Sequence, residues 1–306
     1  MAKPKIAVIG GGLMGHGIAY LFAKAGHEVA IAEPSAQIRE SLPQRWQVII
    51  DLFGDDPQKL TNISVYERLP KAAEGAQFVF EAAPEKLGLK QLLFAELEAV
   101  VSPEAILASN SSAIPSTEIG RKLKHRERVV GTHFWNPPHL VPLVEVIQTQ
   151  WTSAATIAST MELLRSVGWR PVHVRKDIPG FIGNRLQHAL KREAMALVAA
   201  GVCDAETLDT VVKEGFGSRL AVLGPLEQSD LVGLDLTLDI SEVLVQHLDR
   251  SDKPNPYLRK LVAEGKLGMK SGEGFRRWTP QQADEVRERL RNYLAAHAKA
   301  RAFADK

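Results

Sequence analysis

The sequence predicts an α/β protein in two parts, a doubly wound, mainly parallel sheet domain followed by an all-helical C-terminal domain. Two observations predict this. Up to about residue 175, short apolar runs alternate with segments of helical periodicity, which is the pattern of βαβ units. Beyond Asp177–Gly180 the chain has helical spacing almost throughout. A length of 306 residues fits two domains, and we expect 1–178 and 179–306, with the boundary near Pro179.

In the first part, seven apolar runs predict strands. In order they are Lys5–Ile9, Glu28–Ala32, Phe78–Glu81, Ala105–Ala108, Arg128–Val130, Leu143–Ile147 and Pro171–Val174. Four segments of helical spacing connect them. The first, Gly15–Ala25, ends at Gly26, a residue that caps helices well. The others are a segment from Ser35 that Pro43 is expected to interrupt, then Leu87–Val101 and Ser153–Val167.

The second part consists of predicted helices. They are Phe181–Ala200, a helix that Asp204 can N-cap, Leu226–Leu248, Pro256–Glu264 and Pro280–Arg301. The first and third of these carry more apolar surface than one small helical layer can bury alone. We therefore expect a homodimer that forms through this domain.

Composition excludes several function classes. Lys and Arg total 38 and Asp and Glu total 36, so a net charge of +2 offers no electrostatic basis for binding nucleic acid. Cys203 is the single cysteine, which excludes a disulfide framework and favours a reducing compartment, the cytoplasm. We expect no metal site and no membrane contact. The uncharged run Ile6–Ala23 resembles a signal peptide, but its five glycines disfavour that interpretation.

A glycine turn follows the first predicted strand. Its G-x-G-x-x-G pattern consists of Gly10, Gly12 and Gly15, with Leu13 and Met14 inside it, and it opens a helix. The first glycine permits a tight turn, the second lets the backbone approach a pyrophosphate, and the third lets helix and strand pack closely. The free N–H groups at the helix start would bind the phosphates. This context predicts a Rossmann-like, dinucleotide-binding domain.

An acidic residue in the second strand region indicates which dinucleotide is bound. Glu33 lies 23 residues after Gly10, where a carboxylate can bind the hydroxyls of the adenosine ribose. A carboxylate there repels the 2′-phosphate of NADP, and no arginine follows it directly. We expect NAD as the cofactor and a small molecule as the substrate.

Two residues suggest acid–base chemistry. His133 follows a predicted strand, and the carboxyl ends of strands in such sheets carry ligand sites. Glu145 lies inside the apolar run Pro142–Val146, where a carboxylate is costly unless it is paired. The histidine is a natural partner, and the pair would form a general base. A glutamate that reaches water beside a structural histidine is the alternative.

Two further polar segments leave a choice open. Ser109–Ser112 follows a buried strand, where its hydroxyls could meet a ligand or could cap a helix. Asn184 lies at an otherwise apolar helix start, where it could contact a ligand or form a satisfied interhelical hydrogen bond.

Taken together, these motifs resemble the 3-hydroxyacyl-CoA dehydrogenase family along nearly the whole chain. The family implies a Rossmann-like domain and a helical dimerisation domain. The matching stretches, besides the glycine turn, are Glu81–Glu85, Ser109–Ser112, His133–Pro137, Leu143–Val146, Asp177–Leu186, Gly224–Pro225, Gly233–Asp235, Leu261–Glu264 and Lys270–Phe275.

The resemblance implies roles for individual residues. His133, paired with Glu145, would take the proton of the substrate hydroxyl as hydride passes to the nicotinamide. Ser112 would bind the reacting oxygen and Asn184 the substrate carbonyl. The remaining matches are Asn136 near the substrate, and Glu85 and Lys90 near the ribose and nicotinamide of the cofactor.

The branch of the family bears on the substrate. Acyl-CoA members hold the CoA phosphates with a lysine-rich helix, whereas Arg45–Asp56 here has one arginine and three aspartates. Asn136–Glu145 is more similar to the λ-crystallin/L-gulonate 3-dehydrogenase and carnitine dehydrogenase branch, whose members oxidise small free hydroxy acids. Arg219 follows a similar pattern and could bind a carboxylate. The resemblance thus favours a free hydroxy acid. A short-chain 3-hydroxyacyl-CoA substrate and a non-catalytic NAD(H)-binding role are the alternatives.

Overall fold

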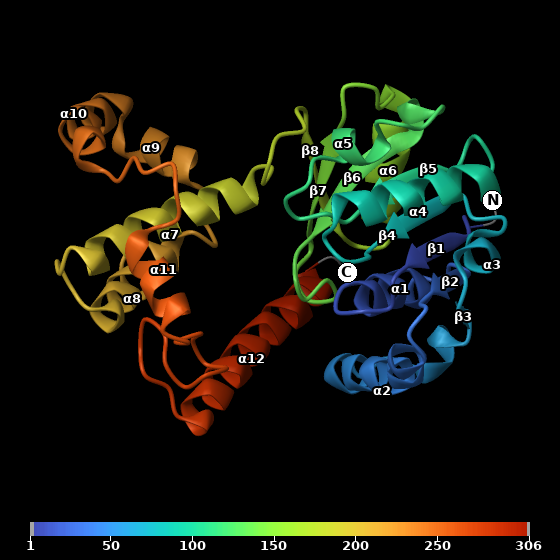
Figure 1. Ribbon diagram of the computed structural model, residues 1–306, viewed down its shortest axis with the longest axis horizontal. Helices are drawn as coiled ribbons and strands as arrows, with labels where there is room; N and C mark the ends of the chain where they lie inside the picture. Colours follow the sequence, from blue (N-terminus) through green and yellow to red (C-terminus); the bar gives the residue numbers. More distant parts are fainter. Residues whose placement is uncertain (1–2, 305–306) are drawn as a thin grey trace. The chain divides into compact units, whose positions relative to one another are not determined.

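The computed structural model describes residues 3–304 and divides into two compact units. The first unit runs through Arg185 and resumes at Arg291, and the second is Leu186–Leu290. The first unit is built on a sheet with the order β3-β2-β1-β4-β5-β6-β7-β8 (Figure 1). The strands are β1 (Ile6–Ile9), β2 (Val29–Ala32), β3 (Ile63–Tyr66), β4 (Phe78–Glu81), β5 (Ile106–Ser109), β6 (Val129–Phe134), β7 (Leu143–Gln148) and β8 (Arg170–Val174).

Neighbouring strands are parallel except at β6 and β7, which confirms the doubly wound, mainly parallel sheet. Alternate side chains of β1 point to opposite faces, so Ile6 and Val8 enter one core and Ala7 and Ile9 the other. Both faces are covered, as a parallel sheet requires. Helices α1 (Gly15–Lys24), α2 (Ala36–Phe53) and α6 (Ala154–Ser166) cover the first face, and α3 (Leu69–Ala73), α4 (Leu87–Val100) and α5 (Ser116–Gly120) the second.

The structure corrects several sequence predictions in this unit. Strand β3 and the short helices α3 and α5 were not expected, because each is brief and β3 is a half-exposed edge strand without an apolar run. Helix α2 continues through Pro43, since the burial of Leu42 and Trp46 outweighs the loss of one hydrogen bond. Strand β6 extends to Phe134, so His133 lies within the strand rather than after it.

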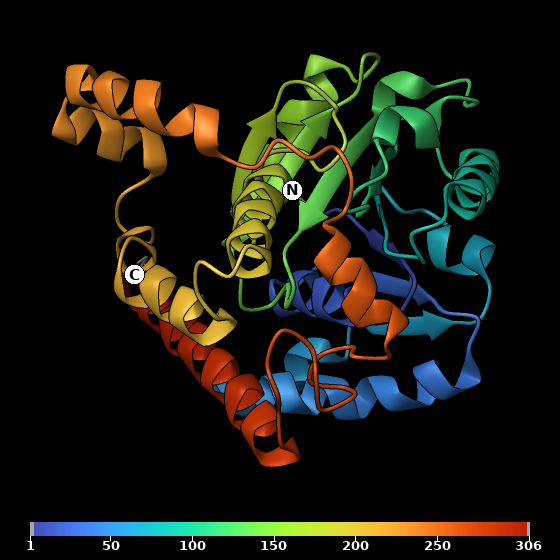
Figure 2. The same cartoon turned by 60° about the vertical axis from the view of Figure 1, so that its left-hand side comes forward.

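The second unit is helical. It contains most of α7 (Gly183–Ala199), then α8 (Ala205–Glu214), α9 (Pro225–Val232), α10 (Leu234–Leu244), α11 (Pro256–Ala263) and the first part of α12 (Pro280–Ala304). The predicted single helix Leu226–Leu248 is wrong. Gly233 has φ +100°, outside the helical range, so it ends α9 and starts α10, and the two helices lie side by side (Figures 1 and 2).

The division by packing differs from a cut at Pro179. Phe181 is buried against Ile147 in the first unit, beyond the expected boundary. The last turns of α12 also return to that unit, where Ala298 packs with Leu140. Short 3-10 turns complete the chain: Pro57–Leu60, Arg126–Arg128, Gly217–Arg219 and Val245–His247.

Candidate active site

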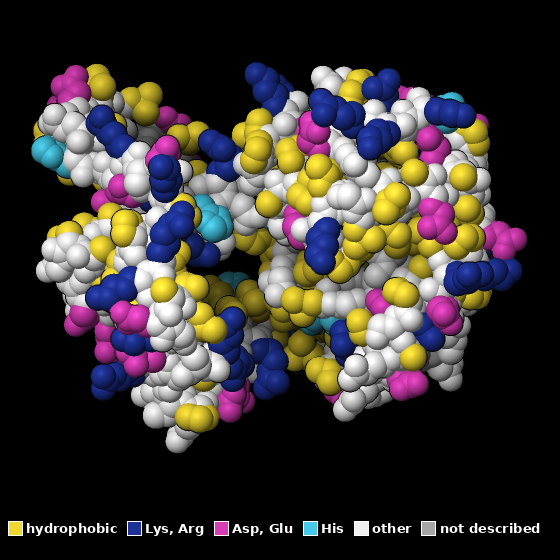
Figure 3. Space-filling model, in the orientation of Figure 1, with side chains coloured by type: hydrophobic (Ala, Val, Ile, Leu, Met, Phe, Trp, Pro, Cys, Tyr) yellow, Lys and Arg dark blue, Asp and Glu magenta, His cyan; other side chains and the backbone are white. Residues whose placement is uncertain are grey.

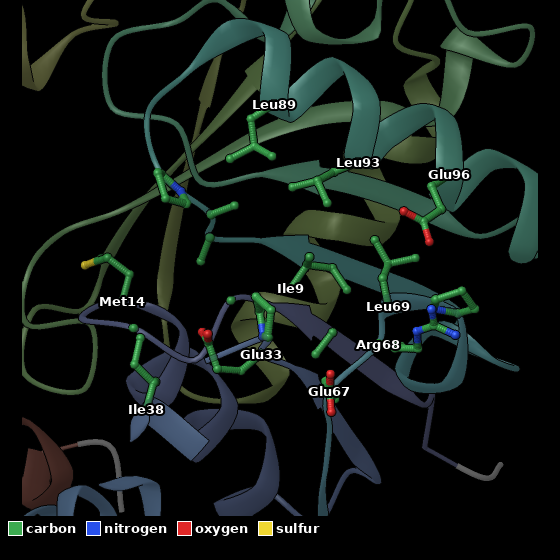
Figure 4. A pocket seen from close by; sticks show the side chains of 18 of the residues that line it. Ile9, Met14, Glu33, Ile38, Glu67, Arg68, Leu69, Leu89, Leu93 and Glu96 are labelled. Carbon is green, nitrogen blue, oxygen red and sulfur yellow. The ribbon is translucent and has the colours of Figure 1, made fainter. Parts of the chain in front are cut away.

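A pocket of about 800 Å³ opens at the carboxyl ends of β1, β2, β3 and β4. The sheet order reverses here, because the chain extends from β1 to β2 on one side and to β4 on the other. Figure 4 shows Glu33 and Glu67 on one side of the pocket and Leu89 and Leu93 of α4 on the other. Of the predicted cofactor residues, the structure brings Gly10, Gly12, Leu13, Met14 and Glu33 to its wall.

The glycine turn fits a bound dinucleotide. A Cβ on Gly15 would lie 1.7 Å from the carbonyl oxygen of Gly10, so close packing of helix and strand excludes any other residue there. A Cβ on Gly12 would meet no heavy atom within 4 Å, although this residue lines the pocket. The protein thus leaves open space beside this backbone, next to the start of α1, where a pyrophosphate can approach it.

The carboxylate of Glu33 is held in place at the end of β2. It is 6% exposed, and its oxygens accept hydrogen bonds from the backbone N–H of Gly11 (2.8 Å) and of Ser35 (2.9 Å). Each carboxylate oxygen can accept more than one hydrogen bond, so ribose hydroxyls can still bind from the pocket side. The position of Glu33 therefore suits NAD.

Lys90 lies away from solvent, in a contact that the sequence did not suggest. It is 0% exposed, and its Nζ donates to both carboxylate oxygens of Glu81 (2.7 and 2.9 Å) and to the carbonyl of Ala83 (3.2 Å). Ser109 donates to Glu81 as well (2.7 Å). A direct cofactor contact by Lys90 stays a prediction; in the structure its ammonium holds the turn after β4. Glu81 was missed, although an acid at the end of an apolar strand is the same signal as at Glu145.

Glu85 anchors the serine loop. Its Oε1 accepts from the hydroxyl of Ser111 (2.5 Å) and from the backbone N–H of Ser112 (3.1 Å), Ala113 (2.9 Å) and Ile114 (3.2 Å). Burial opposes the charged form, but these hydrogen bonds and the nearby Lys90 ammonium outweigh it and lower the pKa of Glu85. The structure thus gives Glu85 a role in placing Ser112, and its predicted cofactor contact stays a prediction.

His133 and Glu145 form a buried pair. They are directly opposite each other on the antiparallel strands β6 and β7. Nδ1 of His133 lies 2.8 Å from Oε2 of Glu145, and the residues are 4% and 1% exposed. The other carboxylate oxygen accepts from the backbone N–H of Ile182 (2.9 Å) and Gly183 (3.0 Å) at the start of α7. The alternative of a glutamate that reaches water is therefore excluded.

The environment of Glu145 keeps it ionised. Burial alone would raise the pKa of Glu145. The hydrogen bonds from His133, Gly183 and Ile182 and the charge of His133 lower it by more than burial raises it, so the pKa lies below its ordinary value. An ionised Glu145 accepts a proton-bearing Nδ1, which leaves the lone pair of Nε2 on His133 available. Among residues 3–304, Nε2 has no hydrogen-bond partner. This geometry can perform general base catalysis.

The remaining predicted substrate residues lie in different places. The side-chain Nδ2 of Asn184 donates to the carbonyl of Ser112 (2.9 Å), so the structure brings these two residues together. Asn184 directly follows Gly183, which binds Glu145. Asn136 is exposed and lies just after β6. Arg219 is exposed in the second unit, in the 3-10 turn Gly217–Arg219. The substrate contacts of all four residues stay predictions.

The described part of the chain has neither a metal-binding cluster nor a membrane-spanning helix. Residues 3–304 contain no group of three or more His, Cys, Asp or Glu side chains arranged to hold a metal ion. In the same range, no helix is both long and apolar enough to cross a membrane.

His139, in the segment between β6 and β7, should make stability depend on pH. Burial and the neighbouring His16 lower its pKa from 6.5 to about 4. The unfolded chain therefore binds this proton first as pH falls, and folding stability is lost between these two values, by at most about 3 kcal/mol. In urea unfolding at pH 7.5 and pH 5, His139→Gln should lose less stability on acidification than the parent. Equal losses would contradict this, and the exposed His125→Gln serves as the control.

Comparison with known proteins identifies the family of the chain. Residues 5–178 match the family profile described as 3-hydroxyacyl-CoA dehydrogenase, NAD binding domain, and residues 180–278 match that of the C-terminal domain. A similar curated protein is the 5-formyl-3-hydroxy-2-methylpyridine 4-carboxylate 5-dehydrogenase of Mesorhizobium japonicum, 36% identical over 95% of this chain and 96% of its own. The probable 3-hydroxybutyryl-CoA dehydrogenase of Bacillus subtilis is 37% identical over 90% of this chain and 97% of its own.

The similar solved structures are also dehydrogenases. A crystal structure of a 5-formyl-3-hydroxy-2-methylpyridine 4-carboxylic acid 5-dehydrogenase, described as an NAD+-dependent dismutase, is similar with a TM-score of 0.91 and 34% identity over 99% of both chains. An (S)-3-hydroxybutyryl-CoA dehydrogenase from Ralstonia eutropha is similar with a TM-score of 0.75 and 29% identity, over 90% of this chain and 99% of that one.

Proposed function

Because the chain belongs to the 3-hydroxyacyl-CoA dehydrogenase family, and is thus an NAD-dependent oxidoreductase acting on CH–OH groups, we propose that it oxidises a small free hydroxy acid through a His133–Glu145 pair. The observation that carries the proposal is the buried 2.8 Å contact between Nδ1 of His133 and Glu145, which leaves Nε2 free to accept a proton. Bound NAD supplies the hydride acceptor. The non-catalytic alternative is disfavoured, because a binding protein has no need of an oriented base.

The proposed mechanism assigns each side chain one task. Nε2 of His133 takes the proton of the substrate hydroxyl as the C–H bond breaks. Glu145 keeps the proton on Nδ1 and stabilises the ring when it becomes positive. The two backbone N–H groups of α7 hold this carboxylate in one orientation. The hydroxyl of Ser112 and the amide of Asn184 would bind the reacting oxygen and a neighbouring carbonyl.

Two features support a free acid over a CoA thioester. Helix α2 and its end carry Asp51 and Asp55 where acyl-CoA members place lysines, and Asp55 neutralises the nearby Lys24 (2.7 Å). The relative that aligns over 95% of this chain is named for a free pyridine carboxylate, whereas the Bacillus subtilis relative, named for 3-hydroxybutyryl-CoA, aligns over 90%. The described residues of α2 include no lysine that could bind the phosphates of CoA. Arg219 is the proposed partner of the substrate carboxylate.

The substrate class is tested by steady-state kinetics with matched pairs. We expect kcat/KM for NADH production to be at least about tenfold higher for free hydroxy acids than for the corresponding CoA thioesters. Such a ratio corresponds to about 1.4 kcal/mol. The panel should pair 3-hydroxybutyrate with 3-hydroxybutyryl-CoA, and should add carnitine, gulonate and hydroxymethylpyridine carboxylates. A tenfold preference for the CoA thioester over every free acid would establish the acyl-CoA alternative instead.

We also propose a homodimer formed through the second unit. Within Leu186–Leu290, Leu261 and Ala283 are the hydrophobic side chains that the described structure buries. By contrast, α9 and α10 bury none, and Leu226 and Leu231 are 80% and 72% exposed. Figure 3 shows hydrophobic side chains at the surface of this pair of helices. Such a face calls for a partner.

Sedimentation velocity at micromolar concentration should therefore give the mass of a dimer. Replacing both Leu231 and Leu238 by Glu should shift the protein toward monomer, because both side chains are exposed on these helices and a charge is costly in an apolar interface. A parent protein that sediments as a stable monomer would refute the proposal.

A further inference from the structure

We propose that the first unit carries a second binding pocket, separate from the cofactor pocket, for a small organic anion with an apolar body. A cavity of about 360 Å³ is lined by the ends of α1, α2 and α6, the segment after β6 and the last turns of α12. It shares no lining residue with the cofactor pocket. Nothing in the proposed reaction uses it.

The charge of this cavity selects an anion. Three cationic side chains line it, Lys24 of α1, Arg170 of β8 and Arg301 of α12, and none of its described lining residues is acidic. Asp55 pairs with Lys24 and accepts from Tyr20, so it neutralises Lys24, and Arg301 is also engaged, because it donates to the carbonyl of Leu140. Arg170 is therefore the expected contact of the anion. Arg170 is exposed, and its guanidinium has no ion pair or hydrogen bond with the residues that the structure describes. It can therefore bind a carboxylate or phosphate in two places at once.

The rest of the wall requires an apolar body on the ligand. Trp169 and Phe53 present aromatic rings, with Leu21 and Pro142 beside them. The indole of Trp169 is fixed, because its Nε1 donates to the carbonyl of Val141 (3.1 Å). A bare inorganic anion would leave this carbon surface in contact with water. An aromatic ring that carries one anionic group uses both the cations and the apolar wall.

The pocket also lies between the end of α12 and the segment that connects β6 to β7. Arg301 donates to the carbonyl of Leu140 (2.6 Å), and Leu140 is buried against Ala298 of α12. Leu140 lies on the segment between β6, which carries His133, and β7, which carries Glu145. A ligand that touches Arg301 and Pro142 together would stabilise the docked end of α12. We therefore expect slower amide exchange in residues 291–301 when the pocket is filled.

Binding is tested on the full chain saturated with NADH, by isothermal titration calorimetry with four probes. Benzoate and phenyl phosphate carry an anionic group on a ring, benzyl alcohol carries the ring without the charge, and inorganic phosphate carries the charge without the ring. We expect one saturable site for at least one of the two aromatic anions, and binding at least about tenfold weaker for the other two probes. Whichever aromatic anion binds more tightly identifies the head group.

Substitutions assign the binding to this pocket. Arg170→Gln should weaken the binding of the aromatic anion by about tenfold, which is the loss of a charge-assisted hydrogen bond. Arg301→Met should weaken it as well. Arg165→Gln, an exposed arginine on α6 that does not line the cavity, should leave it unchanged. In a parallel fluorescence titration, we expect the probe to change tryptophan emission in the parent and not in Trp169→Phe, because Trp169 lines the cavity.

Failure of the second pocket can be distinguished from failure of the proposed reaction, because probe binding does not depend on catalysis. His133→Ala should bind the probe as tightly as the parent, because the assay involves no turnover. The pocket is refuted if neither aromatic anion binds to the NADH-saturated protein, or if binding survives both Arg170→Gln and Arg301→Met.

Discussion

Replacing His133 by alanine is expected to lower kcat by about 10²–10⁴-fold, the usual contribution of a positioned acid–base group. The affinity for NADH should stay nearly unchanged, because the cofactor pocket lies at the ends of β1 to β4 and His133 does not line it. The measurements are steady-state kinetics with the best free acid, fluorescence titration of NADH, and circular dichroism to confirm folding.

The matched control is His125→Ala. This histidine is about half exposed beside Glu127 and lies outside both pockets, so its loss should leave kcat within twofold of the parent. If a folded His133→Ala enzyme retains the parent activity, another group takes the proton and the mechanism proposed above is wrong.

Glu145→Gln is expected to lower kcat by about 10²-fold and to destabilise the fold by about 1–3 kcal/mol. A neutral amide has one oxygen, whereas the carboxylate accepts from Nδ1 of His133 on one side and from the N–H groups of Ile182 and Gly183 on the other. If the NH2 group of glutamine faces Ile182 and Gly183, donor opposes donor. If it faces His133, Nδ1 must give up its proton to accept from it, and the lone pair of Nε2 is lost with the change of tautomer. The NADH affinity should change little, so the loss should appear in kcat and in urea unfolding.

The same variant has a characteristic dependence on pH. The pKa of Glu145 is lowered by folding from 4.5, so its ionised form stabilises the protein above that value, and this contribution is lost as pH falls below it. The stability difference between parent and Glu145→Gln should be largest near pH 7 and should shrink below about pH 4. Glu127→Gln, an exposed control, should show no measurable difference at either pH. A difference that is constant with pH would mean that the charge of Glu145 is not what stabilises the fold.

Much of the fold was readable from sequence because its signals are local. The apolar runs from Lys5–Ile9 onward predicted seven of the eight strands found in residues 3–304, since a buried parallel strand must be apolar on both faces. The glycine turn and Glu33 could be assigned because each acts through its own backbone position or through a strand end nearby. The missed strand β3 is a half-exposed edge, where the apolar signal is weak.

The His133–Glu145 pair was predicted from an unpaired acid in an apolar strand, and the antiparallel register of β6 and β7 decided its geometry. That register depends on which strands become neighbours, which no local pattern specifies. The anchoring of Glu145 by the start of α7 likewise joins residues 37 and 38 positions apart.

The sequence by itself determined the strand pattern, the dinucleotide turn and the types of the candidate catalytic residues. Only the tertiary structure decided what each charged side chain contacts. In the structure Lys90 contacts Glu81, and Glu85 holds the serine loop; neither contact could be predicted from the sequence. The return of α12 to Leu140 was also invisible in the sequence. The physical reason is that burial and charge pairing depend on side chains brought together from distant segments, whereas periodicity and turn chemistry depend on near neighbours alone.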